Sequence, residues 1–288
     1  MMKKTLRLTY PQWQGGMNPD YVFGAELLER IAPPGSTAER AAVTVNGQFD
    51  LKSCRLDGID CGASLLEQAK QAEKILRDKQ PDKVIVFGGD CAVTQVPFDY
   101  LSGKYGGRIG LLWLDAHPDC STVKESSHLH EMVMGNLIGL SPFSEITAVR
   151  HPYEAKRVLL AGVIEEALRP MDMACKEKGI RILSPESLKE NSDEILAWIS
   201  ETGIEYVAVH WDLDVLHPSD FRSIYPAEPY TDPREFPAAV GRMKLSEIVR
   251  ILNDVSKKAE IVGMSITEHL PWDAFNLRRA LKSISIFE

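Results

Sequence analysis

The stretch IGLLWLDAHPD, residues 109–119, carries the strongest fold signal in the chain. Residues 109–114 are long enough for one buried strand, and the apolar run stops abruptly at Asp115. A continuous apolar run of this kind is typical of a parallel sheet that is covered on both faces. Because ligands bind at the carboxyl ends of such strands, Asp115, His117 and Asp119 stand where a functional site is expected.

Four similar apolar runs occur elsewhere, at 84–87, 158–161, 206–209 and 261–266. Amphipathic stretches with helical spacing separate them, most clearly at 62–79. This alternation predicts an α/β fold with a mainly parallel sheet between two layers of helices. No linker or change of composition indicates a boundary, so we expect a single domain over 1–288. Further strands are expected at 6–9 and 42–45, and further helices at 20–31, 163–178, 185–201, 245–257 and 272–283.

The charge balance excludes several classes of partner. The 288 residues carry a formal net charge of -8, which argues against a broad basic surface for nucleic acid. No polybasic run suits a membrane surface, and no apolar run approaches the ~20 residues that a membrane span needs. We therefore expect a small, cationic substrate molecule, and neither nucleic-acid nor membrane partners.

Cysteine usage and the first residues indicate the compartment. The chain has 5 cysteines and no CxxC pair, which favours reduced thiols over a disulfide framework. The opening MMKKTLRLTYPQW contains too short an apolar stretch for a signal peptide. Both features predict a cytoplasmic protein. The cysteines are Cys54, Cys61, Cys91, Cys120 and Cys175.

Two more predicted strands end in acidic residues. Asp212 and Asp214 follow one apolar run, and Glu268 follows another. Residues at i and i+2 of an extended segment project to the same side, so Asp115 and His117 can point at one centre. The same spacing lets Asp212 and Asp214 converge, which predicts one cluster built from several strand ends.

A cluster of this composition suits divalent cations. Neighbouring carboxylates repel one another unless a cation lies between them. Oxygen-rich ligation with one imidazole suits Mn²⁺ best, and Zn²⁺, Fe²⁺, Co²⁺ or Ni²⁺ are alternatives. Four aspartates can bridge two ions, which would generate a strong nucleophile from water near neutral pH. Either motif alone also fits helix capping, and their coincidence at strand ends favours metal. The predicted ligands are Asp115, His117, Asp119, Asp212 and Asp214.

Four motifs, in this order, resemble those of the ureohydrolase superfamily of arginase, agmatinase and formimidoylglutamase. They are GGDC at 88–91, DAHPD at 115–119, DLDVLHP at 212–218 and EHLP at 268–271. The resemblance implies a three-layer α/β/α fold with a mainly parallel eight-stranded sheet. It also implies a homo-oligomer, either a trimer or a hexamer.

The resemblance further implies a metal-dependent hydrolase of non-peptide C–N bonds in a small guanidino, amidino or formimino compound. Members of the family use a hydroxide activated by two Mn²⁺ ions, and that hydroxide attacks the amidine carbon. Transferred by position, some ligands would bridge the two ions and the others would bind one ion only. They are Asp115 and Asp212 as bridges, His117 and Asp214 at one ion, and Asp119 with Cys91 at the other.

Three residues are expected to take part in catalysis by resemblance. His130 matches a histidine proposed to shuttle protons, with His128 as the alternative, and both can instead be exposed loop residues. Glu268 matches a carboxylate that contacts the substrate cation, because a carboxylate accepts paired donors from a planar group. A structural role for Glu268 is the alternative. Asp119 is the third catalytic candidate, as well as a ligand.

Cys91 and His217 depart from the family pattern. Cys91 stands where the family usually has histidine, and a thiolate favours Zn²⁺ or Fe²⁺ over Mn²⁺. A protonated thiol is a poor ligand. A dinuclear site with a cysteine ligand, a site with one firmly held ion, a damaged site and a merely buried cysteine all remain open. His217 replaces an aspartate, and we expect it to support the loop 216–240.

Two other functions stay open on the sequence. A mononuclear Zn²⁺ amide hydrolase, similar to the histone deacetylases, would use Asp115, His117 and Asp212. A catalytically silent arginase-fold binding protein would explain the loss of one histidine ligand. The substrate itself is not predicted, because family specificity depends on the loops around 120–130 and 216–240.

Overall fold

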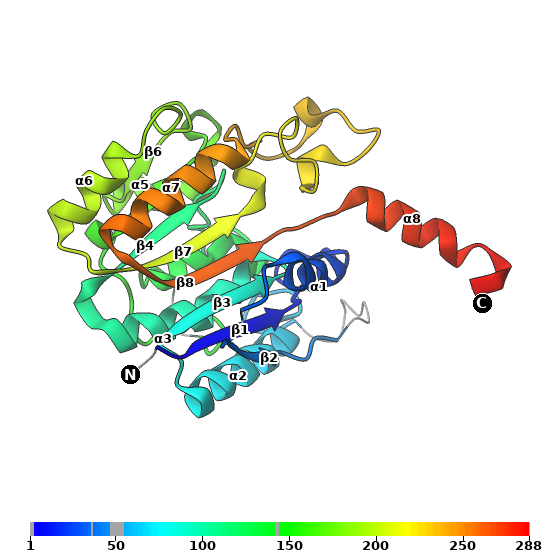
Figure 1. Ribbon diagram of the computed structural model, residues 1–288, viewed down its shortest axis with the longest axis horizontal. Coiled ribbons are helices and arrows are strands. Elements are labelled where there is room, and N and C mark those ends of the chain that lie inside the picture. Colours follow the sequence, from blue (N-terminus) through cyan, green and yellow to red (C-terminus); the bar gives the residue numbers. More distant parts are fainter. Residues whose placement is uncertain (1–2, 36, 47–54, 142–143, 288) are drawn as a thin grey trace.

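Eight parallel strands form one sheet at the centre of the computed structural model, which describes residues 3–35, 37–46, 55–141 and 144–287. Their order across the sheet is β2-β1-β3-β8-β7-β4-β5-β6 (Figure 1). All neighbouring strands are paired in parallel, which confirms the predicted sheet. The strands are β1 (Thr5–Tyr10), β2 (Glu39–Ala42), β3 (Lys83–Gly88), β4 (Ile109–Leu114), β5 (Val158–Ala161), β6 (Arg181–Leu183), β7 (Tyr206–Asp212) and β8 (Glu260–Thr267).

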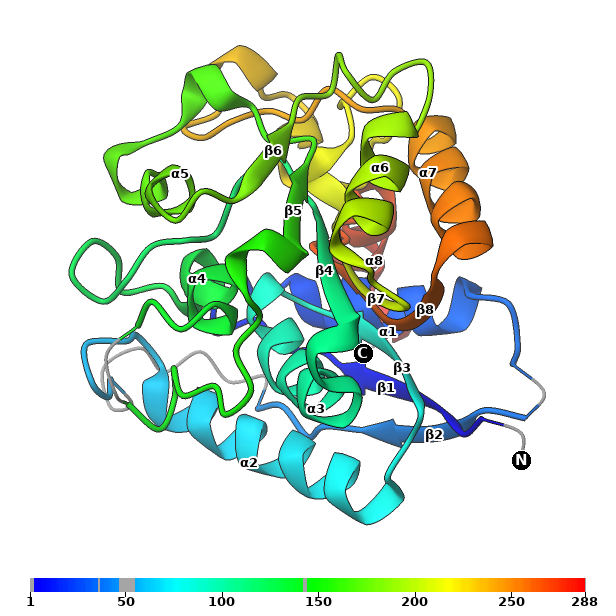
Figure 2. The same ribbon diagram turned by 90° about the vertical axis from the view of Figure 1, so that its left-hand side faces the viewer.

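Helices cover both faces of this sheet, as Figure 2 shows. One apolar core joins the strands to α2 and α3, through Leu65 and Phe98 among others. A second core joins the other face to α6 and α7, through Trp198 and Ile251. Two separate cores on either side of one sheet define the three-layer arrangement. The helices are α1 (Tyr21–Ile31), α2 (Gly62–Lys79), α3 (Gln95–Tyr105), α4 (Val133–Leu137), α5 (Ala174–Glu177), α6 (Asp193–Thr202), α7 (Leu245–Lys258) and α8 (Trp272–Lys282).

The central strand β4 explains why the sequence forms this sheet. All of its residues are buried, as expected for a strand covered on both faces. It pairs with β7 from Ile109↔Tyr206 to Leu114↔Trp211, so the two strands end level with each other. Strands β7 and β8 also end together, at Asp212↔Thr267. The residues that follow these strands therefore start from one edge of the sheet.

Two predicted helices are wrong over much of their length. The segment 163–178 forms short 3-10 turns and only the four-residue α5, because Pro170 lacks the amide hydrogen that a continuous helix needs. In 185–201 the helix starts only at Asp193, where Asn191 Oδ1 accepts the Asp193 N–H at 2.9 Å. A side chain that caps a backbone amide in this way marks a helix start.

Short or exposed elements account for the other differences. The predicted strand at 42–45 lies at 39–42 instead, on the sheet edge, where its residues are mostly exposed and give no apolar pattern. Strand β6 was not predicted, because three residues are too few for a recognisable run. Helix α3 was also missed; Pro97 lies in its first turn, where proline is tolerated.

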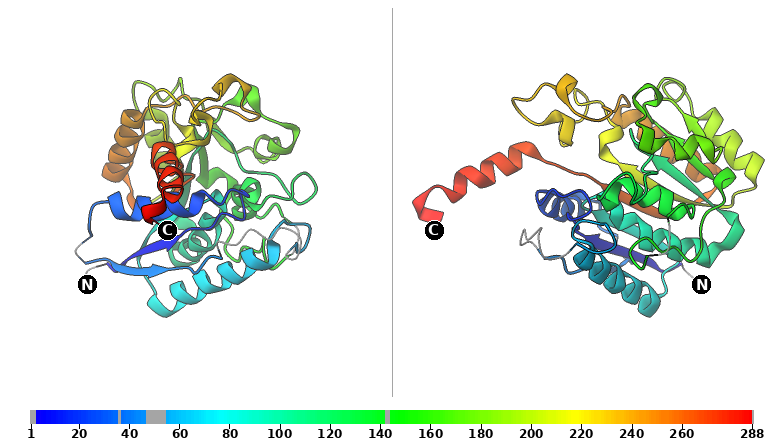
Figure 3. Two further views of the ribbon diagram at one scale, coloured as in Figure 1. Left: turned by 90° about the vertical axis from the view of Figure 1, so that its right-hand side faces the viewer. Right: turned by 180° about the vertical axis from the view of Figure 1, so that it is seen from behind.

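Helix α8 projects away from the rest of the molecule (Figures 1 and 3). Trp272 and Phe275 at its start are buried beside Trp13 and Tyr21. Leu277, further along, is 61% exposed. Within the described residues, the helices are too short or too polar to cross a membrane.

Candidate active site

Four neighbouring strands, β3, β8, β7 and β4, bring the predicted ligands to one edge of the sheet. Cys91 follows β3, Asp115 follows β4, Asp212 ends β7 and Glu268 follows β8. Histidine, cysteine and carboxylate atoms here form three overlapping groups, and within each group the atoms lie within 4.8 Å of one another. The groups are Cys91, Asp115, Asp119 and His210; Cys91, Asp212 and Glu268; and Asp115, His117 and Asp214.

The first half of the cluster is built around His117. Its Nδ1 lies 3.1 Å from Asp214 Oδ2 and 3.4 Å from Asp115 Oδ1. Burial alone lowers the pKa of His117, but these two carboxylates outweigh burial and raise it well above the usual value. Two carboxylates and an imidazole converge on one point, as the i and i+2 spacing predicted.

Asp115 is held rigidly at the junction of the two halves. Trp113 Nε1 donates to Asp115 Oδ2 at 2.9 Å, and the His117 amide donates to Oδ1 at 2.7 Å. Burial, followed by the charge of Asp214, raises the pKa of Asp115 to about 6. Hydrogen bonds of this kind orient a carboxylate for metal binding.

The second half of the cluster is built around Cys91. The Cys91 thiol donates to Asp212 Oδ2 at 2.7 Å and lies 3.7 Å from Glu268 Oε1. Burial and the carboxylates of Asp212 and Glu268 raise the pKa of the thiol well above its usual value. A thiol buried among acids is protonated unless a cation replaces its proton. Cys91 is therefore buried and also directed into the cluster.

Several atoms of the cluster fit a cation better than a hydrogen-bond partner. Among the described residues, His117 Nε2, Asp119 Oδ2 and Asp214 Oδ1 are buried and have no hydrogen-bond partner. Buried polar atoms are normally paired, and a bound ion is one of the recognised reasons for an exception. Carboxylate, imidazole and thiol donors are also the usual ligands of Mn²⁺, Zn²⁺ and Fe²⁺. The residues present thus fit a divalent metal.

Loops around the cluster are fixed by close backbone contacts. Asp90 is fully buried and accepts from the amides of Gly15 and Ala92, at 2.8 and 2.9 Å. Burial raises the pKa of Asp90 to about 7. Asp119 and Glu268 both adopt left-handed backbone conformations, with φ of 47° and 61°. Such strain is found at sites where side-chain direction matters.

Comparison with known proteins places this geometry in a family. The sequence pattern described as "Arginase family" matches residues 19–276. The chain belongs to the arginase family. A mitochondrial arginase of Medicago truncatula is 26% identical over 216 residues, covering 74% of this chain and 56% of that protein. This chain thus spans little more than half of that curated relative.

Solved structures share the arginase fold with this chain. The arginase of Entamoeba histolytica in complex with L-ornithine has a TM-score of 0.76 at 16% identity, covering 94% of this chain and 92% of that one. The proclavaminate amidino hydrolase of Streptomyces clavuligerus has a TM-score of 0.67 at 16% identity, covering 94% and 84%. Both confirm the three-layer arginase fold predicted from the sequence.

In this arginase-family chain, Glu268 is buried, belongs to the cluster and lines its cavity. Tyr21 donates its hydroxyl to Glu268 Oε2 at 2.8 Å, and the Glu268 amide donates to the Gly89 carbonyl at 2.7 Å. Burial, together with the charge of Asp214, raises the pKa of Glu268 to about 8. Tyr21 was not predicted, because 247 residues separate it from its partner.

His130 lines the same cavity as the cluster, whereas His128 is more exposed. His130 Nδ1 lies 2.7 Å from the Gly15 carbonyl, which only accepts, so Nδ1 carries the proton and Nε2 has the free lone pair. Burial lowers the pKa of His130 to about 4.

His217 is exposed, its Nδ1 accepts the Ser219 amide at 3.1 Å, and it lines a different cavity. The loop role expected for His217 agrees with this position.

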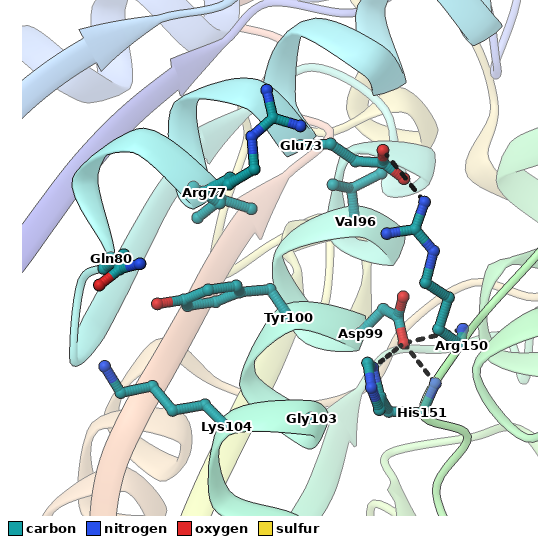
Figure 4. A pocket seen from close by; sticks show the side chains of 11 residues that line it. Glu73, Arg77, Gln80, Val96, Asp99, Tyr100, Gly103, Lys104, Arg150 and His151 are labelled. Atoms are coloured by element: carbon teal, nitrogen blue, oxygen red, sulfur yellow. Dashed lines mark hydrogen bonds and ion pairs between the residues drawn. The ribbon is translucent and has the colours of Figure 1, made fainter.

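The cavity over the cluster is small and polar. Its volume is about 140 Å³, and Arg169, Glu131 and Phe236 contribute to its walls besides the cluster residues. A larger cavity of about 490 Å³ lies between α2 and α3 (Figure 4). There Arg150 pairs with Glu73 and Lys104 with Asp82, so its charges are already balanced. This cavity and a third one of about 540 Å³ beside His217 are both larger than the cavity over the cluster, but the convergent ligand atoms favour the smaller one.

One residue of the cluster was missed by the sequence reasoning. His210 belongs to the group with Cys91, Asp115 and Asp119, and it is fully buried. The available signal was its position two residues before Asp212 on β7, which places both side chains on the same face of the strand.

Proposed function

We propose that this chain is a metal-dependent hydrolase of a non-peptide C–N bond in a small guanidino, amidino or formimino compound. The main support is the set of unpartnered buried donor atoms on His117, Asp119 and Asp214, which line a small cavity in an arginase-family fold. These donors are arranged for a cation, and the small cavity limits the substrate to a compact molecule.

The proposed centre holds two ions. His117 and Asp214 would bind one ion, Cys91 and Asp119 the other, and Asp115 and Asp212 would bridge them. Divalent ions bound there would act as Lewis acids and lower the pKa of water toward neutrality. Mn²⁺ suits the oxygen-rich half, whereas the Cys91 half favours Zn²⁺ or Fe²⁺.

The residues of the chain would bind the substrate and move protons. Glu268, fixed by Tyr21, would accept paired hydrogen bonds from the planar amidine. His130, neutral and with Nε2 unprotonated, would accept a proton and return it to the departing nitrogen. Asp119, which lines the cavity, would hold its ion beside the bound substrate. The walls of the cavity would exclude bulk water from these groups.

We also propose one domain over 1–288, a cytoplasmic location and a homo-oligomer. Cys91, Cys120 and Cys175 are free thiols, as expected in a reducing compartment; Cys54 lies outside the described residues. The projecting α8, with Leu277 exposed, offers an apolar surface to a second copy of the chain. Such a contact would support the trimer or hexamer that the sequence suggested.

A substrate panel tests the proposed function. The protein would be loaded with Mn²⁺, Zn²⁺, Fe²⁺ or Co²⁺ and incubated with linear guanidino, amidino and formimino compounds, while urea, ammonia and formamide are measured. We expect metal-dependent release from at least one compound, abolished by chelator. Release of acetate from acetylated amines by a protein holding one Zn²⁺ would favour the deacetylase-like alternative, which the presence of Cys91 supports. No release from any compound would favour a binding protein.

A further inference from the structure

His210 is a buried histidine whose environment needs explanation. It lies on β7 with none of its surface exposed, and its ring stacks on Trp113 at a centroid distance of 3.6 Å. The ligand set transferred by resemblance does not include His210. A buried imidazole nitrogen without a partner keeps the full cost of leaving water, so both ring nitrogens need a partner.

One side of the His210 ring is fully satisfied. Nδ1 lies 2.8 Å from Thr94 Oγ1 and 3.0 Å from Ser265 Oγ. Thr94 donates its hydroxyl proton to Ser265 at 2.9 Å, so Thr94 Oγ1 is available to accept from Nδ1 of the ring. A hydrogen bond at one ring nitrogen fixes the tautomer in which the other can bind metal.

The other side of the ring faces the candidate metal centre. Among the described residues His210 Nε2 has no hydrogen-bond partner, and it lies 4.0 Å from Asp115 Oδ2. Together with Cys91 Sγ and an Asp119 oxygen, these atoms lie within 4.8 Å of one another. A neutral imidazole binds a metal through its unprotonated nitrogen, and Nε2 is the nitrogen that faces Asp115.

We propose that His210 Nε2 is a ligand of the ion held by Cys91, Asp115 and Asp119. This inference rests on the metal centre of the proposed function and changes its composition. The missing histidine of the Gly-Gly-Asp motif would be replaced by an imidazole from β7. A cysteine and a histidine on the same ion make this half of the centre select Zn²⁺, Co²⁺ or Fe²⁺ over Mn²⁺.

The distances are compatible with a single ion that these ligand atoms would share. Ligand bonds of about 2.0–2.3 Å at tetrahedral angles separate neighbouring ligand atoms by about 3.5 Å. The observed 4.0 Å between His210 Nε2 and Asp115 Oδ2 requires only a slight contraction of the group. Trp113 supports both residues, because it stacks on His210 and donates to Asp115 at 2.9 Å.

Metal titration of His210→Asn tests the proposal. Asparagine keeps a polar atom near the Nδ1 position, for Thr94 and Ser265, and removes only Nε2. Metal-free wild type and variant would be titrated with Co²⁺ and Zn²⁺, following ion content and the near-ultraviolet thiolate-to-Co²⁺ absorption. His128→Asn is the matched control at a half-buried histidine outside the ligand groups, and Cys91→Ser identifies the thiolate band.

We expect wild type and His128→Asn to bind two ions and to show the thiolate band. His210→Asn should weaken the ion at Cys91 by at least about tenfold and shift its Co²⁺ spectrum, while the ion at His117 is retained. Equal affinity and an unchanged spectrum in His210→Asn would overturn the proposal. So would anomalous diffraction from Zn²⁺-loaded wild type with an ion on Cys91 but beyond bonding distance of Nε2, a measurement that does not depend on the variant folding. If wild type binds both ions through these residues yet hydrolyses nothing in the panel, the proposed function falls and this inference stands.

Discussion

At the scale of single residues, the carboxylates were predictable and their partners were not. Spacing alone brings Asp115 next to His117, because alternate residues share one side of an extended segment. Cys91 was expected as a ligand by resemblance, but only the fold shows that its thiol reaches Asp212. Tyr21 comes from a helix far away in the sequence, and no local pattern marks it.

Asp214→Asn tests the half of the centre around His117. The substitution conserves shape but removes the charge that faces His117 Nδ1 at 3.1 Å. We expect the variant to lose one of two ions and at least about a hundredfold of kcat, with its fold unchanged. Metal analysis and circular dichroism would be compared with Asp78→Asn, an exposed control. Full metal content together with full activity would contradict the assignment of Asp214 as a ligand.

The pKa of His130 gives a prediction about proton transfer. Burial lowers the pKa of His130 to about 4. As the pH falls, His130 therefore stays neutral and able to act as a base until the pH approaches that value. Nitrogen-15 NMR of the labelled protein should show His130 neutral at pH 6, with Nδ1 protonated. In His130→Asn, kcat should fall by about tenfold or more while metal content is retained. A His130 that titrates at or above 6.5 would contradict this account.

At the scale of elements, long buried strands were predictable and marginal ones were not. Strand β4 was evident because it is apolar throughout, whereas β6 has three residues and β2 is an exposed edge strand. The segment 163–178 has the composition of a helix, but Pro170 interrupts its hydrogen bonds. Since the site depends on β3, β4, β7 and β8, these errors do not displace it.

Gly89→Ala tests how tightly the loop before Cys91 is packed. A Cβ at position 89 would lie 1.7 Å from the Gln12 carbonyl oxygen, so the backbone of one segment must move. We expect a loss of more than about 3 kcal/mol in the free energy of unfolding, measured by urea denaturation. Gly107→Ala, where nothing lies within 4 Å of the added Cβ, should change it by about 0.5 kcal/mol at most. Equal stability of both variants would show that this contact does not constrain the loop.

At the scale of the whole molecule, the parallel sheet explains why distant motifs form one centre. Adjacent strands with level ends convert separate stretches of sequence into a single cluster. The order of strands was not predictable from periodicity, since it depends on the connections that helices make across the sheet. The sequence likewise did not predict that α8 projects away from the rest of the molecule (Figure 3).

Leu277→Asp tests the proposed assembly. Leu277 is 61% exposed on the projecting α8, and a charge there would oppose burial against a second copy of the chain. We expect the wild type to be an oligomer by analytical ultracentrifugation and the variant to dissociate at least in part. Lys282→Asp on the same helix is a control at a residue that is already charged. A monomeric wild type would refute the homo-oligomer.

The central claim is that this arginase-family chain uses a divalent metal centre to hydrolyse an amidine-type bond. Metal-free protein would be titrated with Mn²⁺ and Zn²⁺, alone and together, while bound ions and turnover of the best panel substrate are measured in the same samples. We predict that turnover rises with the bound metal and reaches its plateau at two ions per chain. Failure of any preparation, including the Mn²⁺-reconstituted one, to retain tightly bound metal would contradict the claim.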